Sequence, residues 1–309
     1  MITTVALNPA VDKIYFIEDF KVGKMFRTDQ IIKSAGGKGI NVARVCKILG
    51  ERVLVIGFKA GYTGDWIEKE LVSIGVDVNF VKVEGEIRTN NNIIDKKNKT
   101  ETEVLEIGHK TKLDDINRFL TVFDGILKQT KVLVLSGGLP QGCPNDFYKV
   151  LIEKAKFKNT LVILDTSGEF LIEGIKAKPD MIKPNLRELS TIVNKQLTEI
   201  DDIVKVCKDI VRSGIAVVTV SMGDKGALLV TKEETLFAKV PSINAVNTIG
   251  SGDSLVAAFA VGFQRGYNID EAFKFAMACG VNNTQYIQVG KVNKTEVIEL
   301  EKQIVIERL

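Results

Sequence analysis

Short aliphatic runs along the chain alternate with longer stretches in which apolar residues recur every three or four positions. The aliphatic runs predict strands, and their nearly continuous apolar character is typical of parallel strands buried on both faces. We expect these strands at Thr3–Leu7, Val53–Phe58, Val132–Leu135, Leu161–Leu164, Met181–Lys183 and Val217–Ser221.

The intervening stretches predict helices, because their apolar residues fall largely on one face, as Ile203, Val206 and Ile210 do. Alternating strands and helices predict βαβ units, so the expected fold class is α/β, with a mostly parallel sheet flanked by helices. The expected helices are Ile40–Leu49, Trp66–Ser73, Leu113–Gln129, Asn145–Phe157, Ile200–Ser213 and Asp253–Arg265.

Two stretches, Lys13–Lys33 and Asp77–Ile107, interrupt this alternation with short β-like runs and polar turns. Strands without helices cannot cover both faces of a sheet, so we expect a small separate sheet that forms a lid or a dimer surface. Residues 1–309 would then form one α/β domain with an inserted lid. The runs are Ile14–Ile17, Asn79–Val83, Asn91–Ile94 and Thr102–Ile107.

The charge balance and apolar content exclude several classes of protein. The 309 residues include 42 Lys and Arg against 39 Asp and Glu, and this net charge of +3 argues against a nucleic-acid binder that relies on overall basicity. The longest uncharged apolar stretch, Leu255 to Phe263, is far shorter than the about 20 residues of a membrane span. The start lacks the basic region of a signal peptide, so we expect a cytoplasmic location.

Cysteine and histidine usage further restricts the chemistry. Cys46, Cys143, Cys207 and Cys279 form no C-x-x-C pair, so we expect buried free thiols. His109 is the only histidine, which excludes a multi-histidine metal site within one chain. It stands among polar residues, and we expect it in an exposed loop rather than as a catalytic base.

The segment Asn247–Phe259 is chemically the most informative, because a turn of Gly250, Ser251 and Gly252 leads into a helix. The free N–H groups and the positive end of the helix dipole form a receptor for an anion such as a phosphate. Asp253, on the same first turn, could accept a proton from a hydroxyl beside that anion. An ordinary glycine-rich loop with Asp253 as a capping residue is the alternative.

A second helix also begins at glycines, in Ala35–Arg44. The spacing is neither that of a P-loop nor that of a dinucleotide-binding fingerprint. Gly37 allows close approach of a ligand, and Lys38 and Asn41 offer a cation and an amide to a polyhydroxylated, anionic molecule. The alternative is a plain helix start with a solvated lysine.

Three further segments follow predicted strands, at the edge where parallel strands bind ligands. Ser136–Pro140 and Ser221–Ala227 are glycine-containing turns that could equally be plain connections. Lys183 precedes Asn185 and Glu188, whose spacing would let both side chains organise a hydrated Mg²⁺. Glu188 could instead be an ordinary charge of a first helical turn.

The order of the motifs along the chain is specific. Gly36–Ala43 (GGKGINVA), Lys183–Leu189 (KPNLREL) and Asn247–Phe259 together resemble the ribokinase-like PfkB family of carbohydrate kinases. The start of the chain and Ser136–Pro140 (SGGLP) resemble the branch that contains 1-phosphofructokinase and tagatose-6-phosphate kinase. The resemblance spans essentially the whole chain and implies a Rossmann-like domain with a small β-sheet lid.

This resemblance implies roles for the nucleotide side of the site. Asp253 would be the general base, Gly250, Ser251 and Gly252 the anion hole, and Asn185 and Glu188 would place Mg²⁺ and the phosphates. ATP would lie near Lys183 and Gly252, with its adenine also near the helix around Gly280–Thr284. It would contact the turn formed by Ser221, Met222, Gly223, Asp224, Lys225 and Gly226.

The resemblance also implies the sugar contacts. Arg88 and Arg27 match arginines associated with the substrate phosphate, and Arg27 would act across a dimer interface. At Gly138, related kinases often carry serine, so one contact to the substrate hydroxyls is expected to be missing. The positions that match residues binding the sugar hydroxyls are Asp12, Gly37, Lys38 and Asn41.

The function implied is ATP-dependent phosphorylation of a ketohexose monophosphate by a homodimer joined through the lids. Fructose 1-phosphate is the first substrate expected, and tagatose 6-phosphate is the alternative. A non-catalytic sugar-phosphate sensor would explain the pocket but not the carboxylate of Asp253. A dinucleotide-dependent oxidoreductase would require G-x-G-x-x-G after the first strand, where this chain has Asn8–Asp12.

Overall fold

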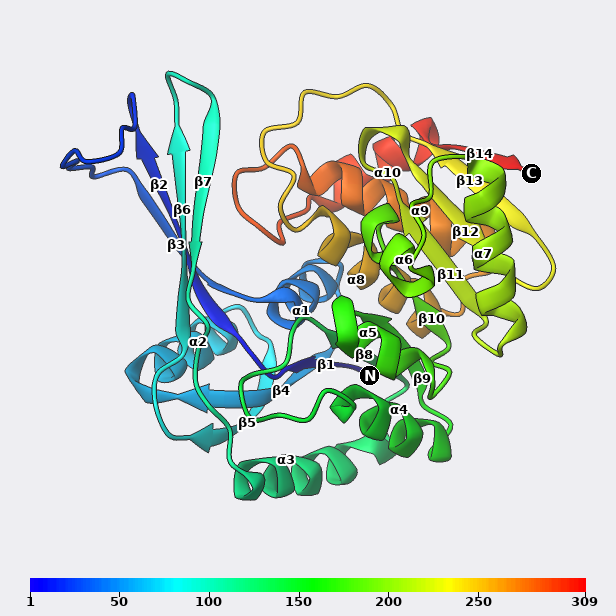
Figure 1. Ribbon diagram of the computed structural model, residues 1–309, viewed down its shortest axis with the longest axis horizontal. Coiled ribbons are helices and arrows are strands. Elements are labelled where there is room, and N and C mark those ends of the chain that lie inside the picture. Colours follow the sequence, from blue (N-terminus) through cyan, green and yellow to red (C-terminus); the bar gives the residue numbers. More distant parts are fainter.

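The computed structural model describes residues 1–309 and contains a ten-stranded and a four-stranded sheet (Figure 1). The large sheet has the order β14-β13-β12-β11-β10-β9-β8-β1-β4-β5, and all its pairs from β11 to β5 are parallel. Its strands are β1 (Ile2–Ala6), β4 (Val53–Ala60), β5 (Asp77–Val83), β8 (Val132–Ser136), β9 (Leu161–Asp165), β10 (Met181–Ile182), β11 (Val217–Ser221), β12 (Ala227–Val230), β13 (Thr235–Lys239) and β14 (Val305–Arg308).

Helices pack against the large sheet, as the alternating pattern predicts. Helices α1 and α8 contact each other and β1, while α3 contacts β4 and β5, and α7 contacts β11 and β12. The helices are α1 (Lys38–Ile48), α2 (Gly61–Ser73), α3 (Leu113–Ile126), α4 (Phe147–Phe157), α5 (Gly168–Ile175), α6 (Leu186–Val193), α7 (Ile200–Arg212), α8 (Ser251–Arg265), α9 (Ile269–Asn283) and α10 (Lys294–Gln303), with short 3₁₀ turns at Leu127–Gln129 and Gly223–Lys225.

Each of the six expected strands and six expected helices is present within a few residues of its expected bounds. All five residues of β1 and of β8 are buried, as the continuous apolar runs predict. One hydrophobic core cluster of 80 buried residues runs through the large sheet and its helices. The four cysteines are buried and free, as expected. No helix has the length and apolar character needed to cross a membrane.

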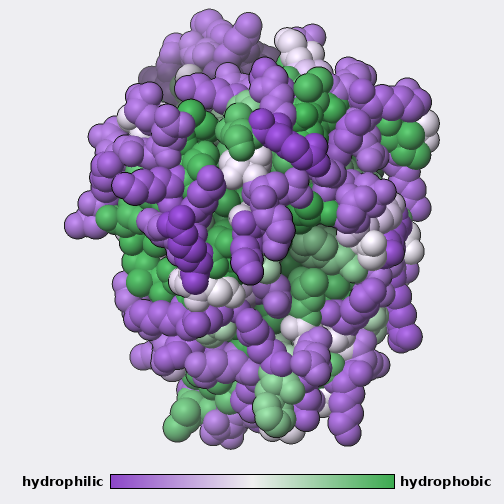
Figure 2. Space-filling view, turned by 90° about the vertical axis from the view of Figure 1, so that its right-hand side faces the viewer, coloured by the Kyte–Doolittle hydropathy of each residue, from purple (hydrophilic) through white to green (hydrophobic).

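The small sheet projects from one corner of the body in Figure 1, where its strands are blue and cyan. It has the order β3-β2-β6-β7 and forms the predicted lid. Hydrophilic side chains cover most of the face on the right-hand side of that view, and apolar ones show only in gaps between them (Figure 2). The lid strands are β2 (Ala10–Ile17), β3 (Ile31–Gly36), β6 (Arg88–Asp95) and β7 (Thr100–Leu105).

Two expectations about this region are wrong. Asn79–Val83 does not belong to the lid, because β5 pairs parallel with β4 at the edge of the large sheet. His109 is not exposed: it is 4% accessible, and its ring packs edge-on against Phe58. Burial lowers the pKa of His109, and the nearby Arg88 lowers it further. A buried neutral imidazole packed on an aromatic ring is consistent with a structural role.

Candidate active site

The turn before α8 has the conformation that its glycines allow. Gly250 is the N-cap residue with φ of 82°, and no side chain caps the helix. A Cβ on Gly250 would lie 2.6 Å from Cγ1 of Val289 and 3.1 Å from Oδ1 of Asn283, so only glycine fits. The uncapped N–H groups and the helix dipole therefore favour an anion at this helix start.

Asp253 is buried on the first turn of α8, where it is 7% accessible. Its Oδ2 accepts a hydrogen bond of 2.8 Å from Nδ2 of Asn41 in α1. Burial raises the pKa of Asp253 to about 6, and Asp165 adds to this effect, while Lys38, Asn41 and Lys183 oppose it. A carboxylate with a pKa near 6 is a stronger base than an ordinary aspartate and is still ionised at neutral pH.

Two lysines converge on Asp165, the last residue of β9, which is fully buried. Lys38 Nζ lies 3.1 Å from its Oδ2, and Lys183 Nζ lies 3.3 Å from its Oδ1. Although burial alone would raise it, the pKa of Asp165 falls below its usual range because of the two cations. Asp165 thus holds one lysine from each half of the predicted site in a single ion cluster.

Sequence reasoning did not identify Asp165 as a site residue. The signal was present, because Asp165 directly follows the expected strand Leu161–Leu164, at the ligand-binding edge of a parallel sheet.

We call Asp253, Lys38, Asp165 and Lys183 the transfer centre. Lys38 keeps a raised pKa despite burial, because Asp165, Asp253 and Glu188 surround it with negative charge.

Glycines also shape the start of α1. Gly37 is the N-cap residue with φ of 94°, and a Cβ there would approach Cα of Pro9 to 3.2 Å. A Cβ on Gly36 would overlap the Asp12 carboxylate, at 1.9 Å from Oδ2. The glycines therefore let α1 begin directly beside Asp12, while the Lys38 side chain extends to Asp165.

Polar side chains also gather at the base of the lid. Asp12 Oδ1 accepts a 2.8 Å hydrogen bond from Asn90, which is paired with Asp12 across β2 and β6. Arg88, at the start of β6, donates to Asn90 Oδ1 and to the Asn8 carbonyl at 3.3 and 3.4 Å, while its Nε is buried without a partner. Burial lowers the pKa of Arg88, and Asp12 partly offsets that effect.

The structure does not bring Arg27 to this group. Arg27 is exposed in a hollow of about 550 Å³ that also includes Phe16, Phe26 and Lys96 of the lid. Gly138 lies in the turn after β8 with open space where a side chain would be, since the nearest atom, in Phe170, is 4.0 Å away. Within one chain, therefore, Arg27 lies apart from Asp12 and Arg88, which both contact Asn90 at the base of the lid.

A cavity of about 640 Å³ adjoins the turn at Gly250. Strand β11 positions this cavity, and its last residue, Ser221, forms a parallel β-bridge with Asn185. Apolar residues of α8 and α9, including Leu255 and Met277, line one side, as an adenine ring would require. Its polar and glycine lining residues are Ser221, Gly223, Asp224, Gly226, Ser242, Thr248, Ser251, Gly252, Gly280 and Thr284.

Some of the residues predicted to contact the nucleotide line this cavity, and others do not. Met222 instead packs against the core, and Lys225 does not line the cavity. Lys183 lies beneath it, with Nζ 3.3 Å from the position of a Cβ on Gly252. Asn282 does not line it, because its amide donates to Gln285 and Glu296.

Asn185 and Glu188 form a reciprocal capping box at the start of α6. Asn185 Oδ1 accepts from the Glu188 N–H at 2.9 Å, and Glu188 Oε2 accepts from the Asn185 N–H at 2.8 Å. This leaves Oε1 of Glu188 available. No group of three or more acidic, histidine or cysteine side chains is arranged to hold a metal ion anywhere in the chain. Such a donor set fits a largely hydrated Mg²⁺ held by one carboxylate and substrate phosphates, rather than a protein cage.

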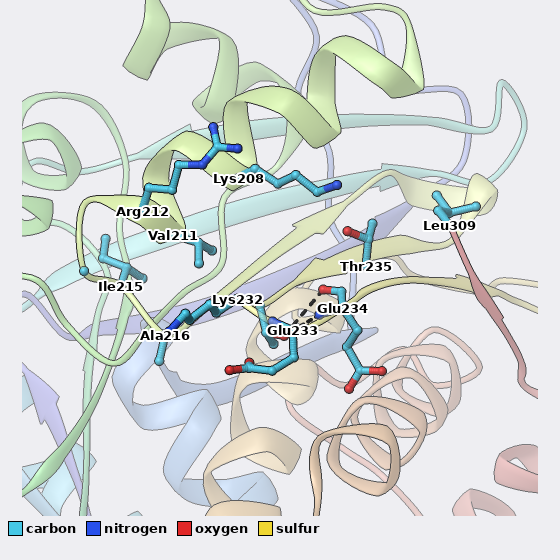
Figure 3. Close-up of a pocket in the computed structure, with 12 residues that line it drawn as sticks. Lys208, Val211, Arg212, Ile215, Ala216, Lys232, Glu233, Glu234, Thr235 and Leu309 are labelled. Atoms are coloured by element: carbon cyan, nitrogen blue, oxygen red, sulfur yellow. Dashed lines mark hydrogen bonds between the residues drawn. The ribbon is translucent and has the colours of Figure 1, made fainter.

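A larger cavity, of about 870 Å³, lies at the opposite end of β11, where Ile215 and Ala216 precede the strand (Figure 3). Lys208 and Arg212 project toward it from α7, and Glu233 comes from the turn between β12 and β13. Its charges are of both signs, and none of the predicted site residues lines it. This end of the sheet is thus separate from the candidate site.

Comparisons with known proteins agree with this geometry. Residues 2–296 match the family described as pfkB family carbohydrate kinase. The chain is 38% identical over 280 residues to 1-phosphofructokinase of Bacillus subtilis, covering 91% of each chain. It is 36% identical over 307 residues to tagatose-6-phosphate kinase of Staphylococcus epidermidis, covering 98% of each. The tetrameric inhibited form of Escherichia coli phosphofructokinase-2 superposes with a TM-score of 0.89 at 27% identity, covering 98% of each chain. The chain therefore belongs to the pfkB family of carbohydrate kinases.

Proposed function

We propose that the protein transfers the γ-phosphoryl group of ATP to a hydroxyl of a ketohexose monophosphate, with fructose 1-phosphate as the first candidate. The observation that carries this proposal is the buried Asp253 carboxylate. It lies at an uncapped helix start, directly after Gly252, which lines the cavity, and it accepts a hydrogen bond from Asn41 at the start of α1. A sensor of sugar phosphates has no need of a base at that position.

In the proposed reaction, Asp253 accepts the proton of the primary hydroxyl as its oxygen attacks the γ-phosphorus. The bond between that phosphorus and the bridging oxygen to the β-phosphate breaks, and ADP leaves. Lys183 and the N–H groups of Gly250–Gly252 would stabilise the negative charge on the transferring group. Lys38 and Asn41 keep the base and the sugar-binding groups in a fixed relative orientation. Most of the acceleration therefore comes from positioning.

Glu188 would hold the Mg²⁺ that accompanies ATP, through its free oxygen and water, while Asn185 caps the helix beside the nucleotide turn. The cation would neutralise phosphate charge when bound. The negative charge of Glu188 also acts on Lys38 and helps keep its pKa high. The carboxylate therefore influences both sides of the proposed site.

Tagatose 6-phosphate is the second candidate substrate, because the Staphylococcus epidermidis relative aligns over 98% of the chain at an identity close to that of the 1-phosphofructokinase. The decisive experiment is a coupled ADP-release assay with fructose 1-phosphate, fructose 6-phosphate, tagatose 6-phosphate and unphosphorylated sugars. We expect the highest kcat/KM with fructose 1-phosphate. A preference for tagatose 6-phosphate would select the second candidate, and ADP release with none would overturn the kinase proposal.

We further propose a homodimer joined through the lids, in which Arg27 contacts the sugar phosphate in the other copy. All residues of the edge strand β7 are exposed, and Arg27 lies in a hollow of the lid that does not include Arg88. Exposed strand edges favour pairing with another chain. Sedimentation equilibrium should give a dimer at micromolar concentration, and Arg27→Gln should raise the KM for the sugar phosphate. A monomer with full activity would contradict this arrangement.

A further inference from the structure

We propose that Arg44 is a positioning residue that fixes the side-chain amide of Asn41 in the orientation that donates a hydrogen bond to Asp253. Arg44 lies one helical turn after Asn41 in α1. The structural part of this inference stands on the contacts of Arg44 alone. Its kinetic consequence rests on the proposed role of Asp253 as the base.

The contacts of Arg44 join three parts of the molecule. Its Nη1 donates to Oδ1 of Asn41 at 3.3 Å and to the carbonyl of Val289 at 3.2 Å. Its Nη2 donates to the carbonyl of Ala35, in lid strand β3, and lies 3.4 Å from Oε1 of Glu70 in α2. The guanidinium therefore contacts α1, the base of the lid and the loop beside Gly250 at once.

The direction of these hydrogen bonds determines the orientation of Asn41. A guanidinium has donors and no acceptor, so it can face only the oxygen of the asparagine amide. With Oδ1 held by Arg44, the Nδ2 group is turned to the other side, where it donates to Asp253 at 2.8 Å. If the amide were flipped, its N–H groups would face the guanidinium and its oxygen would face the carboxylate, and both contacts would be repulsive.

Arg44 is itself held in place. Its side chain is 13% accessible, and Glu70 also accepts a 3.0 Å hydrogen bond from the Ala35 N–H. Gly290 permits the close packing, because a Cβ there would lie 3.3 Å from both Nη1 of Arg44 and Cα of Asn41. Any side chain at position 290 would press on the same pair of residues.

Other charges act on Asp253 directly and must be separated from this effect. Lys38, Asp165 and Lys183 face the carboxylate, while Glu70 and Asp12 are the acidic groups near Arg44. Asn41 lowers the pKa of Asp253 through its hydrogen bond. Because Arg44 contacts Asn41 and Asn41 contacts Asp253, the inferred route from Arg44 to Asp253 passes through Asn41, and a direct effect of the Arg44 charge would persist when Asn41 is removed.

A double-mutant cycle tests this route, with the pKa of Asp253 measured by ¹³C NMR of the side-chain carboxyl in the free protein. Arg44→Met should raise that pKa by about 0.5–1 unit, the equivalent of one hydrogen bond to the carboxylate. Asn41→Ala should raise it by a similar amount, and Arg44→Met in the Asn41→Ala background should add nothing. If the single variant folds poorly, Arg44→Met with Glu70→Gln, compared with Glu70→Gln alone, avoids leaving a partly buried carboxylate without its cation.

Arg265→Met is the matched control, because Arg265 also donates to a carbonyl and a carboxylate, those of Leu49 and Glu51, at the far end of α8. It should leave the pKa of Asp253 unchanged. An unchanged pKa in the Arg44 variants, or an equal further rise in the Asn41→Ala background, would overturn the inference. The pKa of Asp253 could rise in Arg44→Met without an equal rise in the apparent pKa of the acid limb of kcat. That result would keep the positioning role of Arg44 and overturn the assignment of Asp253 as the base.

Discussion

The transfer centre and the lid hold their charged side chains in opposite ways. In the transfer centre, Asp165 is fully buried and Lys183 is 5% accessible, and both sit at the ends of strands in the large sheet. In the lid, every residue of β7 is exposed, and Arg27 lies in an open hollow. The charges of the transfer centre are thus built on the packed body, while Arg27 and the charges of β7 lie on the exposed sheet that we propose recognises the ligand.

Under the proposed function, the charges of the transfer centre serve the chemical step, and those of the lid serve binding of the sugar phosphate. Buried ion clusters lose much free energy when one member is removed, whereas exposed charges lose little until a ligand engages them. Substitutions in the transfer centre should therefore change kcat and folding stability. Substitutions at the base of the lid should change KM for the sugar phosphate.

The largest effect is expected from Asp253→Asn, which removes the proposed base but keeps a similar shape. The variant should fold normally and lose about 10²–10⁴-fold in kcat, because proton acceptance in the transition state is lost. Steady-state kinetics and circular dichroism measure the two properties. Turnover near that of the wild type would refute the assignment.

Next in size is the effect of Asp165→Asn on stability. Lys38 and Lys183 would face each other without the carboxylate that pairs them, so the free energy of unfolding should fall by about 3 kcal/mol. Urea denaturation measures this loss. The control is Asp124→Asn, which breaks the exposed pair with Lys154 and should cost less than about 1 kcal/mol. Equal losses in the two variants would remove the contrast between buried and exposed charges.

Arg88→Gln tests the lid. The KM for the sugar phosphate should rise by about 10- to 100-fold, the range for lost hydrogen bonds between charged groups, while kcat changes little. Arg118→Gln, which breaks two ion pairs within α3, serves as the control and should leave the KM unchanged. A fall in kcat with constant KM would assign Arg88 to the transfer centre instead.

The smallest effect is expected at the cavity beyond the other end of β11. Changing Lys208 and Lys232 together to Met should alter kcat/KM by less than about twofold, since both lie far from the site on the opposite edge of the sheet. A larger change in the ADP-release assay would mean that this cavity communicates with the active site.

Sequence patterns predicted the body better than the lid. Continuous apolar runs such as β1 and β8 have only one stable environment, between two layers of helices, so their place was predictable. The run Asn79–Val83 has a half-buried pattern that suits either sheet, and only its pairing with β4 decides between them. Local periodicity carries no information about which sheet an edge strand joins.

The site residues divide in a similar way: those fixed by local backbone geometry were predictable, and those that depend on distant contacts were not. Glycine-rich turns at Gly37 and Gly250 were predictable, because their backbone conformations require glycine. Asp165 was missed because its role depends on two lysines that are distant in sequence. The burial of His109 was missed because its neighbours in the chain are polar, while the ring against which it packs, Phe58, comes from the distant strand β4. The proposed contact of Arg27 depends on a second chain.

The pH dependence of kcat tests the central claim most directly, because an acid limb that comes from Asp253 should disappear in Asp253→Asn, whereas one that comes from the substrate phosphates, which also titrate at about pH 6, should remain. With fructose 1-phosphate as substrate, kcat should rise with pH through an apparent pKa of about 6 and then level off, because the base must be deprotonated. Asp253→Asn should abolish this limb. A kcat that is independent of pH between 5 and 7, or an acid limb that persists in Asp253→Asn, would contradict the account.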